Sequence, residues 1–409
     1  MRNPSQKCRQ VAPLRVAGNA RRRARVLSLT FAVVATSTAG ARTAWAQQGP
    51  SALPPQVTAR LDSLMKAQLA VDGIGGMTVG VVTDSGLLWT SSVGFADMAR
   101  REPASRATVY RIGSITKQFT AIALLQLARR GALRMSDPAD RFFPALDSVR
   151  GQDEWPHRVT LVQLATMTSG LAQEPDDEAS YTTGSLGDWK QILATALRHT
   201  KFDAEPGTAW EYSNIGYASL GAALEGAAGV PYVDYVRDHI LTPLGMTHTG
   251  FALDPRLHGR LATGYAMAHD TVDTLQSRRE LVGRGYKVPN GGLFSTVDDL
   301  AAFIRFEMGN GSDRVLPPAE LKAHFATITY ATADMSSGYG VGFHAVRRGS
   351  MLALGHPGSV AGYLSAAYFD PVTHTGAIVL RNVDDARFDV LGVCLQILAI
   401  AADSRQPTK

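Results

Sequence analysis

The sequence predicts an α+β fold in which an antiparallel sheet is built from both chain ends and is flanked by helices. Alternating β-branched residues, typical of strands, occupy residues 77–97 and return from Gly338 onward. Between Ser114 and about Leu321 the apolar residues recur mostly at helical spacing. Strands at both ends of a helical middle imply that the sheet joins the two ends of the chain.

The N-terminal 46 residues have the composition of an export signal. They contain nine Lys or Arg residues and no acidic residue, and the basic run RRRAR precedes the apolar stretch VLSLTFAVVATSTAGA. The triplet AWA suits cleavage before Gln47, whereas the short, interrupted apolar run disfavours a retained membrane anchor. We therefore expect a periplasmic or secreted protein with residues 1–46 removed by Sec or twin-arginine export and residues 47–409 forming a single domain.

Removal of this segment changes the charge balance. Nine of the 41 basic residues lie in it and none of the 36 acidic residues does, so the remaining chain is slightly acidic. Nothing then supports nucleic-acid binding. Of the two cysteines, Cys8 would leave with the signal and Cys394 lies in the apolar run VLGVCLQILAIAA, which predicts a buried thiol without a disulfide.

The first elements of the domain are a helix and a hairpin. In residues 57–69 the residues Val57, Leu61, Leu64 and Leu69 form one apolar stripe. Two strands then meet at the turn Asp84-Ser85-Gly86.

The helical middle contains one long irregular segment, AQEPDDEASYTTGSLGDW (residues 172–189), which is acidic and polar. A loop of that length usually has a function, and we expect it to border the site. After residue 338 four strand patterns follow, and an apolar helix closes the chain.

Two Ser-x-x-Lys motifs are present, and their contexts differ. Ser63 lies in mid-helix off the apolar stripe, which favours a surface serine. Ser114 follows Gly113 and opens a long helix, so its amide lacks an intrahelical partner and Lys117 shares its face. Ser114 can therefore offer a nucleophilic oxygen and an amide directed at an oxyanion.

Other serine-hydrolase patterns are weak or missing. The chain has no G-x-S-x-G, and Ser85 reads as a turn residue. The stretch WEYSNIGYASLG instead places Tyr212 and Asn214 just before a helix, where a capping role for Ser213 or Asn214 with Tyr212 as a packing aromatic is the structural alternative.

His-x-Gly occurs three times, beginning at His248, His356 and His374. The first follows a helix and the third lies in a predicted hairpin connection. Only LALGHPGSVAGY places the triplet at the exit of an apolar strand between glycines, where backbone can approach a substrate. His356 and Gly358 are therefore the candidates for the opposite wall of the site.

Ser-x-x-Lys, Tyr-x-Asn and His-x-Gly in this order resemble the serine β-lactamase and penicillin-recognising hydrolase superfamily, and are most similar to its class C β-lactamase, D,D-peptidase and esterase branch. Tyr-Ser-Asn and His-Pro-Gly depart from the S-D-N and K-T-G of class A enzymes. The stretches GFADMARREPASRATVYRIGSITKQFTA, VTLVQLATMTSGL, EPGTAWEYSNIGYASLG, LTPLGMTHTGF and GGLFSTVDDLAAF extend the likeness over nearly all of residues 47–409.

The resemblance implies a β-lactamase-like fold in which the active site lies between a sheet half and a mainly helical half. The sheet half would comprise residues 47–110 and 335–409, and the helical half residues 111–334. No cofactor and no metal is implied, and the ten histidines show no close ligand spacing.

The resemblance also implies roles for the motif residues. Ser114 would be acylated, Lys117 would accept or steer its proton, and Tyr212 would transfer protons to the leaving group and the deacylating water. A cationic Lys117 would favour the Tyr212 phenolate. Asn214 would hold Lys117 and the substrate.

The strand with His356 and Gly358 would complete the substrate-binding wall. The amides of Ser114 and Ser359 would form the oxyanion hole, with Gly358 keeping that wall open.

We expect a serine hydrolase acting on small esters, amides or short D-amino-acid peptides, with peptidoglycan fragments as a further partner class. A β-lactamase or D,D-carboxypeptidase is one alternative, and a catalytically silent cell-wall-binding or sensor protein is another. A neutral His356 and Pro357, which lacks a donor, predict weak carboxylate recognition and poor β-lactam turnover. Arg279 or Arg284 on the rim would restore that contact.

Overall fold

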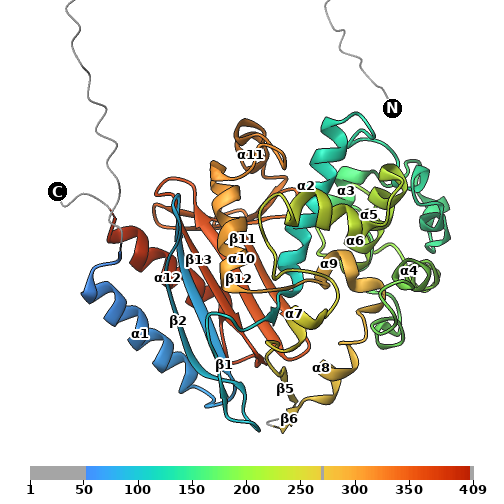
Figure 1. Ribbon diagram of the computed structural model, residues 1–409. Helices are drawn as coiled ribbons and strands as arrows, with labels where there is room; N and C mark the ends of the chain where they lie inside the picture. The colour runs from blue at the N-terminus through green and yellow to red at the C-terminus, as the bar shows by residue number, and fades with distance from the viewer. Residues whose placement is uncertain (1–51, 269–270, 406–409) are drawn as a thin grey trace, which may run out of the picture. The chain divides into compact units, whose positions relative to one another are not determined.

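A nine-stranded antiparallel sheet is the largest element of this computed structural model, which describes residues 52–268 and 271–405 (Figure 1). In spatial order its strands are β3 (Glu102–Pro103), β2 (Gly86–Asp97), β1 (Gly76–Thr83), β13 (Thr375–Arg381), β12 (Tyr363–Asp370), β11 (Met351–Val360), β10 (His344–Arg348), β9 (Ser337–Tyr339) and β8 (Tyr330–Ala331). The described residues all belong to one compact unit.

The two ends of the chain meet at the β1–β13 pair. Met77 lies opposite Arg381 and Thr83 opposite Thr375, in antiparallel register. The sheet from both ends, predicted from the strand patterns, is confirmed, as is the hairpin that joins β1 to β2. In β1, β12 and β13 every residue is buried, because helices cover both faces of the sheet.

One face of the sheet packs against the first and last helices, α1 (Pro55–Leu69) and α12 (Val390–Asp403) (Figure 1). Val79 and Val81 point into this layer, whereas the next residue, Val82, joins the other core, as the two-residue period of a strand requires. Cys394 lies in this layer, fully buried and without a disulfide, as its apolar surroundings predicted.

The opposite face is covered by α10 (Val297–Arg305), which contacts β1, β2 and β13. Beyond it lies the helical region, whose other helices are α2 (Thr116–Arg129), α3 (Leu161–Ala165), α4 (Trp189–Leu197), α5 (Asn214–Ala228), α6 (Tyr232–Val236), α7 (Pro255–His258), α8 (Leu275–Arg279), α9 (Val288–Gly291) and α11 (Pro318–Phe325).

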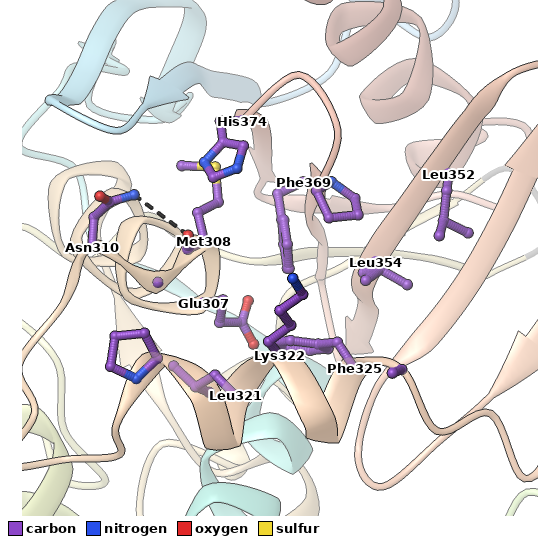
Figure 2. A pocket seen from close by; sticks show the side chains of 14 residues that line it. Glu307, Met308, Asn310, Leu321, Lys322, Phe325, Leu352, Leu354, Phe369 and His374 are labelled. Atoms are coloured by element: carbon purple, nitrogen blue, oxygen red, sulfur yellow. Dashed lines mark hydrogen bonds between the residues drawn. The ribbon is translucent and has the colours of Figure 1, made fainter. Parts of the chain in front are cut away.

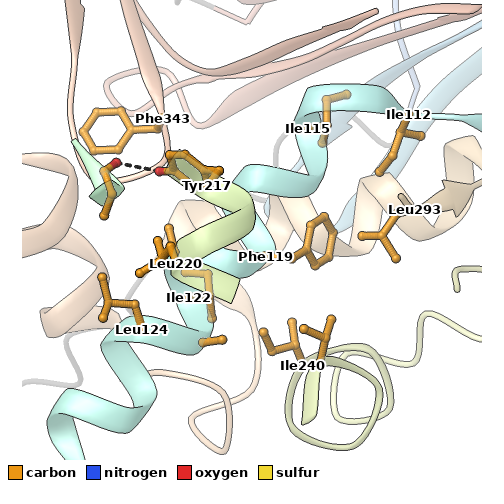
Figure 3. Packing of buried hydrophobic residues seen from close by; sticks show 14 of the residues in the cluster. Ile112, Ile115, Phe119, Ile122, Leu124, Tyr217, Leu220, Ile240, Leu293 and Phe343 are labelled. Atoms are coloured by element: carbon orange, nitrogen blue, oxygen red, sulfur yellow. Dashed lines mark hydrogen bonds between the residues drawn. The ribbon is translucent and has the colours of Figure 1, made fainter. Parts of the chain in front are cut away.

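The helix α2 is buried nearly all round, which is the pattern of a helix inside a core. Figure 3 shows its apolar side chains Phe119, Ile122 and Leu124 together with Leu220, Ile240 and Leu293 from other parts of the helical region. This packing fixes the element that begins just after Ser114.

Small strand pairs that the sequence pattern did not predict connect the helical region to the sheet. The pair β4 (Tyr110–Arg111) with β7 (Phe294–Ser295) is antiparallel, and β5 (Tyr265–Ala268) pairs with β6 (Thr271–Asp273) and with β14 (Val383–Asp384). Because β4 ends two residues before Gly113, it anchors the approach to Ser114.

Candidate active site

Ser114 lies in a 3₁₀ turn, Gly113–Ile115, that leads directly into α2. Gly113 has a φ of +48°, and a side chain there would come within 2.9 Å of the Ser359 amide nitrogen. Glycine is required for both reasons. The turn therefore brings the residue before Ser114 against the backbone of β11.

Lys117 lies one helical turn after Ser114 and points at it. Its Nζ is 3.1 Å from Ser114 Oγ, and it also donates to Asn214 Oδ1 at 2.7 Å and to the Asn290 carbonyl at 3.1 Å. The side chain is fully buried, and this burial lowers the Lys117 pKa well below its usual value. Desolvation thus favours the neutral amine, the form that can accept a proton from Ser114.

Tyr212 reaches the same oxygen from the start of α5. Its hydroxyl donates to Ser114 Oγ at 2.9 Å, and Lys117 Nζ lies 4.7 Å from the centre of its ring. The neighbouring Ser213 caps α5 by accepting from the Gly216 amide at 3.0 Å. The capping interpretation of this stretch therefore holds for Ser213, while Tyr212 lies in the site.

Burial raises the pKa of Tyr212, partly offset by its hydrogen bond with Ser114. This differs from the expectation that Lys117 would favour the phenolate. Burial disfavours the anionic phenolate, just as it disfavours the charged amine of Lys117. Both shifts therefore favour the uncharged forms of the two groups that contact the Ser114 hydroxyl.

Glu174 is a site residue that the sequence reasoning did not name. Its Oε1 accepts from Asn214 Nδ2 at 2.6 Å and from Lys287 Nζ at 2.9 Å, and Oε2 accepts from the Tyr286 hydroxyl. Glu174 lies in the acidic segment 172–189. The sequence signal that could have found it is the expectation that this long loop borders the site. The carboxylate charge partly counteracts the lowering of the Lys117 pKa.

The opposite wall is β11, held against the turn that carries Ser114 by a second close approach. A side chain at Gly358 would lie 2.2 Å from the Ile112 carbonyl and 2.4 Å from Ser365 Oγ. The structural reason for Gly358 is therefore contact between two backbones, rather than an open wall. This contact brings the exposed Ser359 beside Gly113.

His356 differs from its predicted role. Only 2% of the residue is exposed, and its Nδ1 lies 2.6 Å from the Pro357 carbonyl and its Nε2 3.2 Å from the Tyr339 hydroxyl. This pattern fits a neutral ring that donates from Nδ1 and accepts at Nε2. Burial lowers the His356 pKa to about 3. Both nitrogens are thus engaged within the protein, so the ring supports the wall instead of contacting a substrate.

A polar cavity of about 250 Å³ adjoins Ser359. Its cations are paired: Arg284 with Glu280, and Lys287 with both Glu174 and Glu178. Glu280 also accepts from the buried Arg111 at 2.8 Å. Arg284 therefore lines this cavity paired with a carboxylate that it shares with Arg111.

The other candidates lie elsewhere. Arg279 is exposed and does not line this cavity. Ser63 is exposed on α1 and donates to the Ala59 carbonyl at 2.8 Å. His248 lies near Asp299, and His374 lies in the β12–β13 turn near Asp84.

Two features are absent from residues 52–268 and 271–405. No group of three or more His, Cys, Asp or Glu side chains in these ranges is arranged to hold a metal ion. None of the helices in the same ranges has the length and apolarity needed to cross a membrane. The export signal predicted for residues 1–46 lies outside the described residues.

The family model described as "Beta-lactamase" matches residues 61–392 of this chain. The chain belongs to the Beta-lactamase family. This family is part of the serine β-lactamase and penicillin-binding protein superfamily, so the resemblance seen in the motifs is confirmed, and with it the fold class.

Similar proteins agree with this assignment. Protein flp of Staphylococcus aureus (strain MW2) is 26% identical over 339 residues, covering 80% of this chain and 63% of that protein. The human Putative beta-lactamase-like 1 is 28% identical over 281 residues, covering 66% of this chain and 53% of that protein. The chain thus spans less than two thirds of the length of these relatives.

A solved structure with the same fold is the octameric penicillin-binding protein homologue from Pyrococcus abyssi. The TM-score is 0.68 at 23% identity, over 86% of this chain and 79% of that chain. This likeness shows that the two chains share a fold.

Proposed function

We propose that this protein is an active serine hydrolase that works through an acyl-enzyme on neutral esters or amides. The observation that carries the proposal is the convergence on Ser114 Oγ of Lys117 Nζ at 3.1 Å and the Tyr212 hydroxyl at 2.9 Å. A weak nucleophile needs a base within hydrogen-bond reach, and a leaving group needs an acid.

Acylation begins as Ser114 Oγ attacks the substrate carbonyl carbon and its proton passes to the neutral amine of Lys117. The negative charge moves to the carbonyl oxygen, which the amides of Ser114 and Ser359 stabilise. As the carbonyl re-forms, the bond to the leaving group breaks. Tyr212 gives its proton to the leaving oxygen or nitrogen and regains one from the Lys117 ammonium.

Deacylation uses the same groups with water as the nucleophile. Water adds to the acyl carbonyl carbon while its proton passes to the tyrosine and lysine pair. Collapse of the second tetrahedral intermediate expels Ser114 Oγ, which takes a proton back. The acid product leaves, and Ser114, Lys117 and Tyr212 return to their starting protonation states.

The charge pattern around the site supports neutral substrates. His356 is buried and neutral, Pro357 has no amide donor, and the cations Arg284 and Lys287 are already paired with carboxylates. Each missing charge-assisted hydrogen bond costs roughly 1.5–3 kcal/mol of carboxylate binding, which weakens recognition by one to two powers of ten. Neutral esters and amides lose nothing by this.

A parallel rate panel tests the proposal. Purified protein is assayed with p-nitrophenyl butyrate, a D-amino-acid p-nitroanilide and nitrocefin, and Ser114→Ala serves as the blank. We expect kcat/KM for the ester or the D-amino-acid amide to exceed that for nitrocefin by roughly tenfold or more. A clearly higher kcat/KM for nitrocefin would indicate a β-lactamase instead. No turnover with any of the three substrates would favour a catalytically silent binding protein.

We infer further that the protein acts outside the cytoplasm. The support is the composition of residues 1–46, with nine basic residues followed by an apolar run and the AWA triplet. In that compartment peptidoglycan fragments are accessible partners. Expression of the full chain followed by N-terminal sequencing of the exported form tests this, with Gln47 as the expected first residue and retention in the cytoplasm as the contrary result.

A further inference from the structure

Two carboxyl groups outside the catalytic set, those of Glu307 and Asp384, have no cation beside them among the described residues. Glu307 borders a mostly apolar cavity that Ser114 does not line, and Figure 2 shows its carboxyl among the apolar side chains beside α11. It is only 4% exposed and accepts a hydrogen bond from Gln118, so it is enclosed within the protein. Asp384 differs, because it is half-buried and lies beside the catalytic wall.

Asp384 contacts Ser359, the β11 residue whose amide the proposed mechanism places in the oxyanion hole. Its Oδ1 lies 3.5 Å from Ser359 Oγ. Its Oδ2 has no hydrogen-bond partner among the described residues and is not buried, so it is open to a ligand. The amide nitrogen and Oγ of one serine are roughly 3–4 Å apart. A carbonyl oxygen held by this amide therefore lies within roughly 10 Å of the carboxylate.

The backbone that carries Asp384 is fixed on both sides. Asp384 lies opposite Ala266 in the parallel pair of β14 and β5. Two residues earlier, the buried Asn382 donates from Nδ2 to three backbone carbonyls at 2.9–3.2 Å. One residue later, Asp385 pairs with Arg387. The carboxylate of Asp384 is therefore held in place before a ligand arrives, which lowers the entropic cost of binding.

The charge of Asp384 is additional to the ion pairs of the neighbouring cavity. That cavity borders a network with as many cations as carboxylates, whose members are Arg111, Arg284, Lys287, Glu174, Glu178 and Glu280. Burial raises the pKa of Asp384, and the charge of the adjacent Asp385 raises it as well. Both effects disfavour the Asp384 anion, and a cation beside it would counteract them.

We propose that Asp384 selects substrates that carry a cationic group near the scissile carbonyl, and that it disfavours substrates with a carboxylate at that place. The inference rests on the serine hydrolase activity proposed above and narrows its substrate class. The favoured substrates are short esters or amides with an ammonium group. The nitrogen lies beside Asp384 Oδ2 while the amides of Ser114 and Ser359 hold the carbonyl oxygen.

Two pairs of substrates of equal shape test this with the full folded protein. Butyrylcholine and 3,3-dimethylbutyl butyrate differ in a nitrogen cation or a neutral carbon on the leaving group. D-Alanine p-nitroanilide and isobutyryl p-nitroanilide differ in an ammonium or a methyl on the acyl group. The ratio of kcat/KM within each pair is measured for the wild type, Asp384→Asn and Asp298→Asn, with Ser114→Ala as the blank.

Asp298→Asn is the matched control, because it removes the same charge at an exposed site where Asp298 pairs with Arg106. In the wild type, the cationic member of at least one pair should have a kcat/KM roughly tenfold higher than its neutral partner. The pair that shows this tells whether the cation lies on the leaving group or the acyl group. Asp384→Asn should abolish most of that ratio with little effect on the neutral member, whereas Asp298→Asn should keep it.

Salt provides a readout that needs no variant. Because attraction between partly exposed charges is screened, the wild-type ratio should fall as NaCl rises from about 0.01 M to about 1 M. A ratio that does not respond to salt would overturn the inference. If Asp384→Asn does not fold, Asp384→Ser provides the same comparison.

The outcomes separate this inference from the activity on which it rests. Neutral members that turn over with the same ratio in the wild type and Asp384→Asn would overturn the role of Asp384 and leave the serine hydrolase activity standing. A wild-type preference for the neutral member of both pairs would do the same. No turnover of any of the four probes would overturn the proposed activity, and this inference with it.

Discussion

Glu174 holds the side-chain amide of Asn214 by accepting from its Nδ2 at 2.6 Å, which leaves Oδ1 turned toward Lys117. The orientation of the amide matters because only the oxygen can accept from the lysine. Glu174 therefore acts on Lys117 through Asn214 and also through its own charge. These two effects can be separated by substitution.

The Glu174→Gln substitution removes the charge and keeps an oxygen that can accept from Asn214. Since the carboxylate partly counteracts the lowering of the Lys117 pKa, its loss should lower that pKa further. The amine then stays unprotonated to lower pH, so the acid limb of the pH profile of kcat/KM should shift to lower pH. Hydrolysis of p-nitrophenyl butyrate measured across the pH range checks this direction.

Two further variants complete that experiment. Glu174→Ala frees the Asn214 amide, and kcat should fall roughly tenfold or more, beyond any loss in Glu174→Gln. Glu178→Gln is the matched control, because Glu178 also pairs with Lys287 but has no contact with Asn214. An acid limb that moves equally in Glu178→Gln and Glu174→Gln would show that Glu174 has no special position.

Lys117→Ala and Tyr212→Phe should each lower kcat by a factor of about a hundred or more, because each removes proton transfer at Ser114. Both should fold, which circular dichroism and Tm measurements verify. A fluorophosphonate probe should label the wild type and not Ser114→Ala. Ser63→Ala, in the exposed second Ser-x-x-Lys motif, should keep full labelling. Near-wild-type turnover in Lys117→Ala or Tyr212→Phe would refute the role assigned to that residue.

Gly358→Ala tests the contact between β11 and the turn that carries Ser114. The added methyl group would lie 2.2 Å from the Ile112 carbonyl, so β11 must move and carry Ser359 away from Gly113. We expect kcat to fall with a smaller change in KM, since the oxyanion hole acts mainly in the transition state. Gly259→Ala, whose methyl group would meet no atom within 4 Å, should leave both unchanged.

His324 should make the protein less stable in acid. Burial lowers the His324 pKa to about 4, below the ordinary imidazole value of about 6.5. The unfolded chain therefore takes up a proton below about pH 6.5 that the folded chain refuses until about pH 4, so stability falls as the pH drops through this window. His324→Phe, beside Phe325 and Phe343, should flatten the fall in Tm between pH 7 and pH 5. An unchanged slope would exclude His324 as its source.

The sheet and the Ser114–Lys117 pair were predictable because their signals are local. Alternation marks each strand, and a spacing of three places the two side chains on one helical face. The β-lactamase-like fold followed from the order of the motifs. The family match over residues 61–392 bears this out.

Other features depend on packing that no short segment encodes. Glu174 meets Asn214 from a loop forty residues earlier, and the backbone contact of Gly358 with Ile112 spans most of the chain. The burial of His356 depends on Tyr339 in a different strand. The lowered pKa of Lys117 follows from complete desolvation, which only the assembled core around α2 produces.

The pairing of β1 with β13 has a consequence for biosynthesis. On a ribosome, β1 (Gly76–Thr83) emerges long before its partner β13 (Thr375–Arg381), because most of the helical region lies between them. Until then the inner edge of the β1–β2 hairpin has exposed backbone groups, which can pair with other chains. A nascent or prematurely terminated chain that lacks β13 therefore cannot close the centre of its sheet, and it depends on being kept apart from other chains until β13 has emerged.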